Sequence, residues 1–210
     1  MCNFLSMIVT KSDLLWSKKS DHHENIIKRF RLNDGIRGGD FVRIEMTPPQ
    51  SWDGISLEGW TFNTDLYVLP DWYSAKEAET CVRSRLKAVL NSITAKDGQV
   101  IDGGRWIVLK GTVELKDGYC YAYGSSVINQ SGGICRVFRS SIVNLSGGRC
   151  HAYKRSTVNQ SGGWCWADGT STVNLSGGFC HAFQSSTVNQ SGGECEIYSL
   201  NATLNKVDKG

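Results

Sequence analysis

The feature that most constrains this chain is a set of six cysteines separated by a constant 15 residues. They are Cys120, Cys135, Cys150, Cys165, Cys180 and Cys195. The sequence around them nearly repeats: residues 157–163 read TVNQSGG and residues 172–178 read TVNLSGG. A short, fixed period of this kind is typical of a protein built from stacked coils. It predicts a β-solenoid in the second half of the chain.

Each repeat contains two short segments in which apolar and polar residues alternate. Val173 and Leu175 lie on one side of the first segment, and Asn174 lies on the other. In the second segment, Cys180 and Ala182 are expected to point inward. The predicted core is therefore narrow, and its cysteines are reduced, small core residues rather than disulfides. The recurring asparagines predict a ladder of amide hydrogen bonds along the stack.

A second period of 30 residues is superimposed on the first. The residue after each asparagine slot alternates between leucine and glutamine, in the order Leu115, Gln130, Leu145, Gln160, Leu175 and Gln190. If this slot points inward, each glutamine must hydrogen-bond to its neighbours or to the backbone, because an unsatisfied buried amide is costly. The alternative is that the slot lies near a corner of the coil. The pattern leaves both interpretations open.

The first part of the chain lacks this repeat. Strands are expected over residues 4–10, 14–16, 41–46 and within 57–69. Two helices are expected to begin at capping boxes, formed by Asp21 with Glu24 and by Ser74 with Glu77. The predicted fold is mainly β, with a small α+β domain over 1–96 and a β-solenoid of six to seven 15-residue coils over 97–210.

Composition excludes several classes of protein. The net charge is only +3, and no run of apolar residues is long enough to cross a membrane. The first residues do not read as a signal peptide, which together with reduced cysteines predicts a cytoplasmic protein. The adjacent His22 and His23 should point apart on a first helical turn, and no short zinc-binding pattern occurs. We therefore expect no metal site and no cofactor.

The outward slots next to the cysteines vary from coil to coil. They carry aromatic and cationic side chains, which we name the aromatic–basic face: Tyr119, Tyr121, Arg136, Arg149, His151, Trp164, Trp166, Phe179 and His181. Between Gly118 and Ala167 there is no acidic residue. Such a face can pack against the rest of the chain or a second copy, bind a protein partner, or stack on a nucleic acid or nucleotide.

One catalytic candidate lies at the start of the chain. After removal of Met1, Cys2 would carry both a thiol and a new α-amino group, the arrangement of an N-terminal nucleophile with its own base. Met1-Cys2 followed by an apolar strand is similar to the start of class II glutamine amidotransferases, although Asn3 stands where those enzymes have glycine. The resemblance implies an amidohydrolase-like enzyme with Cys2 as its nucleophile.

Two further resemblances concern the repeats. The Thr-x-Asn array at Thr157, Thr172 and Thr187 resembles the threonine arrays of insect β-solenoid antifreeze proteins, which implies ice binding. A domain starting Met1-Cys2 with a short-repeat tail resembles uncharacterised bacterial and bacteriophage accessory proteins, which implies an anti-defence or host-takeover factor. The favoured hypothesis is a non-enzymatic protein that binds a protein partner. The alternatives are an enzyme using Cys2 and a self-assembling homo-oligomer.

Overall fold

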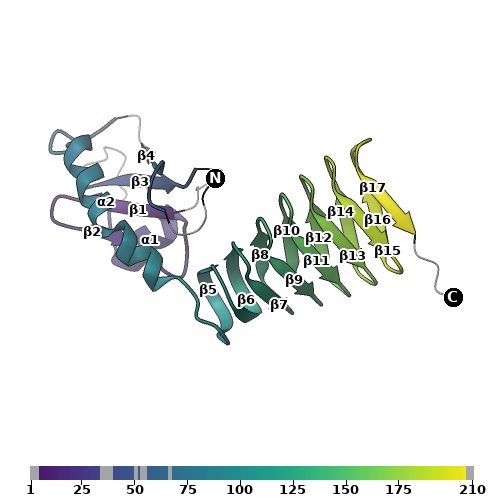
Figure 1. The fold of residues 1–210 in the computed structure, drawn as a ribbon. Coiled ribbons are helices and arrows are strands. Elements are labelled where there is room, and N and C mark those ends of the chain that lie inside the picture. Colours follow the sequence, from purple (N-terminus) through teal and green to yellow (C-terminus); the bar gives the residue numbers. More distant parts are fainter. Residues whose placement is uncertain (1–4, 34–39, 50–51, 53–55, 66–67, 207–210) are drawn as a thin grey trace. The chain divides into compact units, whose positions relative to one another are not determined.

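The computed structural model describes residues 5–33, 40–49, 52, 56–65 and 68–206. As the repeat predicts, the protein is mainly β, with a small α+β unit followed by a β-solenoid of about seven turns (Figure 1). The two compact units are Met1–Ile93 and Thr94–Gly210. The sequence places this boundary after residue 96. It falls earlier because Thr94 bridges to Ile107, and the Ala95 N–H donates to the Ile107 carbonyl.

The N-terminal unit contains a four-stranded antiparallel sheet in the order β2-β1-β3-β4. Its elements are β1 (Leu5–Thr10), β2 (Leu14–Trp16), α1 (His23–Phe30), β3 (Phe41–Thr47), β4 (Thr61–Thr64) and α2 (Ala75–Ser92). Ser6 pairs with Glu45 and Ile8 with Arg43, so these four side chains share one face of the sheet. Helix α1 packs on this face, because its buried isoleucines belong to the same core cluster as Ile8.

The two predicted capping boxes have different outcomes. Ser74 is the N-cap of α2, and its hydroxyl accepts a hydrogen bond from the Glu77 backbone N–H at 3.4 Å. The prediction for Asp21 is wrong: His22 is the N-cap of α1, without a side-chain capping bond, so the Asp21 carboxylate comes one residue too early. Within 57–69, where a strand or a pair of strands is expected, the described residues contain β4 at Thr61–Thr64, and Val68 and Leu69 are not in a strand.

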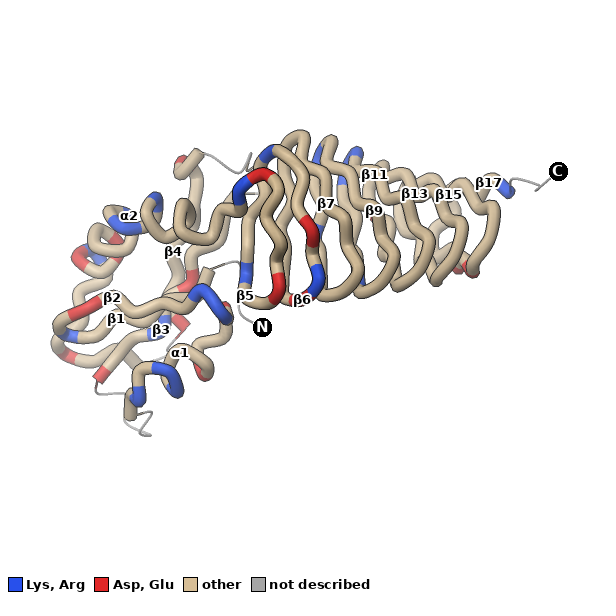
Figure 2. The backbone as a smooth tube through the Cα atoms, turned by 90° about the horizontal axis from the view of Figure 1, so that it is seen from below, with Lys and Arg blue, Asp and Glu red and all other residues tan. Residues whose placement is uncertain are grey.

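The solenoid begins with two long strands and continues with two short strands per coil. They are β5 (Val100–Val108), β6 (Thr112–Ala122), β7 (Val127–Gln130), β8 (Ile134–Val137), β9 (Ile142–Leu145), β10 (Arg149–Ala152), β11 (Thr157–Gln160), β12 (Trp164–Ala167), β13 (Thr172–Leu175), β14 (Phe179–Ala182), β15 (Thr187–Gln190), β16 (Glu194–Ile197) and β17 (Thr203–Lys206). Even-numbered strands stack in parallel on one side and odd-numbered strands on the other, and β6 is long enough to take part in both stacks. Figure 2 shows how few charged residues the later coils carry.

The core between the two stacks has the predicted composition. It is a continuous cluster that consists mainly of valine, leucine, cysteine and alanine side chains, with isoleucine at Ile101 and Ile128. Five of the six repeat cysteines are buried free thiols, and Cys195 at the last coil is partly exposed. Burial raises the pKa of the Cys195 thiol to about 12, and burial together with the neighbouring Cys120 thiol raises the pKa of Cys135 further. Protonated, buried thiols are unreactive, so these cysteines are core residues.

The glutamine slot points inward beside the Gly-Gly turn, so the two open interpretations are both correct. Gln160 is 1% exposed, and its Nε2 donates to the carbonyls of Gly163 and Phe179, each at 3.0 Å. Gln130 does the same with Gly133 at 3.1 Å and Arg149 at 2.9 Å. Gln130 and Gln160 thus each join their own turn to the residue that follows the next turn, whereas Gln190, in the last such coil, bonds to Gly193 of its own turn. The intervening coil needs no amide there and carries leucine, which explains the 30-residue period.

Candidate functional site

All nine residues of the aromatic–basic face lie on the outer side of the even-numbered strands β6 to β14. The parallel register places Arg149 beside Trp164, and Trp164 beside Phe179. In the second column, His151, Trp166 and His181 are neighbours in the same way. Successive coils therefore bring these side chains together at the strand spacing, about 4.8 Å.

Ring stacking fixes the orientation of these side chains. His151 and Trp166 are stacked with ring centroids 4.7 Å apart and planes at 10°. Trp164 packs against Phe179 at 4.9 Å, and Phe179 meets His181 edge to face at 4.8 Å. Aromatic pairs in these geometries are attractive beyond their buried area. The face is therefore a row of rings held in place before anything binds.

The accessibility of the nine residues is uneven. Tyr119 and Trp164 are 48% and 49% exposed, and Arg136 and Arg149 are also exposed. His151, Trp166, Phe179 and His181 are half-buried by their neighbours. Tyr121 is only 7% exposed, with the Arg136 guanidinium 5.9 Å from its ring centroid. Tyr121 points outward as predicted, but its ring is not accessible for contact.

Charge is distributed unevenly along the face. Arg136 and Arg149 lie on β8 and β10, whereas Glu194 and Glu196 lie on β16 at the far end. Burial, followed by the charges of Arg136 and Arg149, lowers the pKa of His151. This imidazole is consequently neutral at pH 7 and contributes a ring rather than a charge.

A third column of rings lies beside the predicted face. Tyr123 stacks on Phe138 at 4.8 Å, and Phe138 stacks on Tyr153 at 5.1 Å. Phe183 and Tyr198 continue the column at 5.0 Å, after an interruption at Asp168. The 15-residue spacing reveals this column in the sequence, but its residues were not among the predicted site residues. Tyr123 is only 6% exposed, so this column adds aromatic surface at its other four rings alone.

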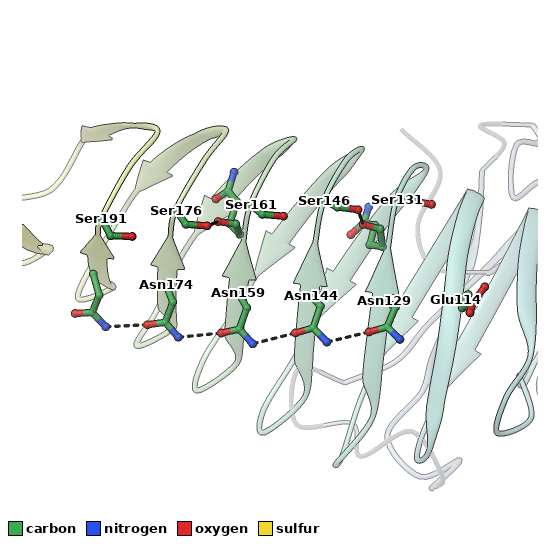
Figure 3. Close-up of a pocket in the computed structure, with 13 residues that line it drawn as sticks. Glu114, Asn129, Ser131, Asn144, Ser146, Asn159, Ser161, Asn174, Ser176 and Ser191 are labelled. Atoms are coloured by element: carbon green, nitrogen blue, oxygen red, sulfur yellow. Dashed lines mark hydrogen bonds between the residues drawn. The ribbon is translucent and has the colours of Figure 1, made fainter. Parts of the chain in front are cut away.

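The odd-numbered strands present a different surface, a polar groove of about 790 Å³ (Figure 3). Its asparagines form the predicted ladder: the Asn159 amide donates to Asn144 at 2.9 Å, and the Asn174 amide donates to Asn159 at 2.9 Å. Serine hydroxyls in the groove also bond to the preceding coil, as in the 3.0 Å bond from Ser146 to the Gln130 carbonyl. The polar groups of this face therefore stabilise the stack itself.

The N-terminal unit places one of its two adjacent histidines in the interior. His23 is 1% exposed, and its Nε2 lies 3.0 Å from the Ile44 carbonyl oxygen, whereas His22 is exposed. Ligand atoms of His23, Glu45 and Asp65 all lie within 4.8 Å of one another. The sequence predicts no metal site, since these residues come from separate elements and form no short motif. Cys2, the predicted nucleophile, lies outside the described residues, and its role stays a prediction.

Comparisons with known proteins add no assignment. Family models, curated proteins and solved structures show no match to this chain. Among the described residues, neither helix has the length and apolar character needed to cross a membrane. Function has to be argued from the geometry of the surfaces above.

Proposed function

We propose that the solenoid is a protein-binding module and that the aromatic–basic face, without the buried Tyr121, is its contact surface. The observation that supports this most is the row of packed rings around the half-exposed Trp164, with the exposed Arg149 in the preceding coil and the exposed Arg136 one coil further. Protein interfaces are enriched in tryptophan, tyrosine and arginine. Rings already held by stacking lose little conformational entropy when a partner binds.

The charge order favours a protein partner over a nucleic acid. A phosphate backbone requires cations along its whole track. Here Glu194 and Glu196 end the face, and His151 is neutral at pH 7. A protein with an acidic patch beside an apolar one is complementary to β8–β12. As a setting we propose the cytoplasm of a bacterial host, with a phage-encoded chain acting in host takeover or anti-defence.

The direct test is recovery of partners from host lysate with the tagged full-length chain. The Trp164→Ala/Trp166→Ala variant should lose at least tenfold in recovery of a partner that the wild type retains. A matched control, Thr157→Ala/Thr172→Ala, alters the opposite face and should retain that partner. Equal recovery of every partner by wild type and the tryptophan variant would show that this face is not the contact surface.

Self-association is a second candidate function. The order of charges along the face, with arginine on β8 and glutamate on β16, favours it too. With a two-fold axis parallel to the strands and centred on β12, β8 of one chain faces β16 of the other. Arg136 would then oppose Glu196 of the second copy, while Trp166 meets its own equivalent. This is a self-complementary, isologous arrangement. Arg136→Glu should dissociate such a dimer, and Arg136→Glu/Glu196→Arg should restore it, as measured by analytical ultracentrifugation. A wild-type monomer at high concentration would exclude the dimer.

A further inference from the structure

We infer that His23, Glu45 and Asp65 form a binding site for a divalent transition-metal ion in the N-terminal unit. This site is independent of the proposed partner surface, because it lies in the other unit and depends on different chemistry. Its three ligand atoms are already within 4.8 Å of one another. Around a tetrahedral zinc ion, ligand atoms are about 3.3 Å apart, so binding requires the most distant pair to move closer by up to about 1.5 Å.

The backbone holds the three residues around one point. Glu45 lies on β3, and the Asp65 N–H donates to the Arg43 carbonyl at 3.0 Å, which continues the β4 pairing alongside it. His23 is the first residue of α1, which packs on the sheet face that carries Glu45. The Asp65 side chain is 66% exposed, so it can rotate to close the last part of the distance.

The tautomer of His23 suits a metal ligand. A carbonyl oxygen only accepts hydrogen bonds, so the Nε2 atom 3.0 Å from the Ile44 carbonyl must carry the proton. In the neutral ring the lone pair is then on Nδ1, which lies 3.9 Å from Asp65 Oδ2. Metal-binding histidines are commonly oriented by such a bond from the other ring nitrogen. A metal ion bound to this lone pair would also lie beside the two carboxylates.

A second observation, from β1, points to the same place. Ser6 pairs directly with Glu45 across β1 and β3, so both side chains point to the same face. Ser6 is 1% exposed, and its hydroxyl has no hydrogen-bond partner among the described residues. A metal-bound water would supply one. Arg43 also lies on this face, with its guanidinium carbon 5.9 Å from the centroid of the Phe41 ring.

The donor set determines the class of ion. One imidazole nitrogen and two carboxylate oxygens suit Zn²⁺, Mn²⁺, Fe²⁺ or Co²⁺. Calcium and magnesium prefer oxygen ligands alone. Copper(I) prefers thiolate ligands, and none of the three residues is a cysteine. Three protein ligands leave a coordination position for water, as in zinc sites that bind a substrate.

The test uses the full-length chain stripped of metal by a chelator. Titration with Zn²⁺, followed by calorimetry and elemental analysis after dialysis, should give one ion per chain. His23→Gln, Glu45→Gln and Asp65→Asn should each weaken binding at least tenfold. His22→Gln changes the adjacent, exposed histidine and should bind normally. Because Asp65 is the most exposed of the three residues, Asp65→Asn should disturb folding least. A native circular dichroism spectrum of this variant would show that it has lost metal binding and not its structure.

Two results would overturn the inference. The first is that the ion binds elsewhere. Equal Zn²⁺ binding by the wild type and a folded Asp65→Asn variant would show this, and a cobalt complex with thiolate charge-transfer absorption would place the ion on cysteine. The second is binding of neither Zn²⁺ nor Co²⁺ nor Mn²⁺ by the wild type, with nitrogen NMR showing both ring nitrogens of His23 protonated at pH 7. A proton would then be the cation between the carboxylates.

Discussion

The two faces of the solenoid have the same backbone and period but differ in their side chains. On the odd-numbered strands the asparagine slot repeats, because each amide bonds to the identical amide of the next coil. On the even-numbered strands, one column contains Arg149, Trp164 and Phe179 in succession. Ring faces and guanidinium groups stack without requiring an identical neighbour. Repetition therefore marks side chains that hold the stack together, whereas variation marks a surface available for recognition.

The largest expected effect comes from breaking the repeated turn. A Cβ at Gly162 would lie 2.4 Å from the Ser146 carbonyl oxygen of the preceding coil. Gly162→Ala should therefore destabilise the solenoid by about 3 kcal/mol, because the coils must separate locally. Urea unfolding followed by circular dichroism measures this. Ser161→Ala is the matched control and should change the stability by less than about 1 kcal/mol, since it removes only a 3.3 Å hydroxyl bond.

A smaller loss is expected from interrupting the ladder. Asn159→Ala removes two amide bonds, one to Asn144 and one from Asn174. Because these amides are exposed, the unfolding free energy should fall by about 1–2 kcal/mol. Asn129→Ala, which removes only the bond from Asn144, should cost about half as much. Equal losses for the two variants would show that the ladder contributes little beyond local packing.

Substitution on the variable face should affect binding more than folding. Trp164→Ala removes the contacts of a half-exposed ring with Trp166 and Phe179. The expected loss of stability is about 1 kcal/mol, in line with aromatic pairs elsewhere. A loss of more than about 3 kcal/mol would place Trp164 among the residues that hold the stack together and remove the contrast between the faces.

The smallest effect is a pH dependence associated with His151. Its pKa is lowered in the folded protein by burial and by Arg136 and Arg149. The unfolded chain therefore binds more protons below about pH 6.5, and the stability contribution present above that pH is lost as the pH falls through the folded pKa. His151→Gln should reduce the difference in unfolding midpoint between pH 7.5 and pH 5.5. His22→Gln, in the other unit, serves as the control and should leave the midpoint of the solenoid unchanged.

The solenoid is predictable because its determinants are local and repeated. Cys180 and Ala182 are buried as their alternation predicts, and Asn174 bonds along the stack. The inaccessibility of Tyr121 could not be predicted, since alternation indicates the direction of a side chain and not what covers it. The bonds of Gln160 were likewise undecided, because they depend on where the turn carbonyls of the next coil lie.

The N-terminal unit was less predictable for a related reason. Its strands were located approximately, but no period links its elements, so the register between them was not available from the sequence. Glu45 and Asp65 become neighbours of His23 only when β3, β4 and α1 assemble. A sequence search for metal ligands depends on short spacings, and this cluster has none.

The glutamine bridges also limit how such a protein changes length. Deleting one coil between Gln130 and Gln160 would bring two glutamines into adjacent coils, so that two amides would be packed at neighbouring turns where the protein alternates glutamine with leucine. Deleting a glutamine coil would instead leave two leucine coils together and turn carbonyls without their amide donor. Insertions and deletions should therefore occur in modules of two coils, and each module changes the length of the stack by about 9.6 Å. Recombination, natural or engineered, is expected to preserve this pairwise step and to extend the recognition surface by two rows at a time.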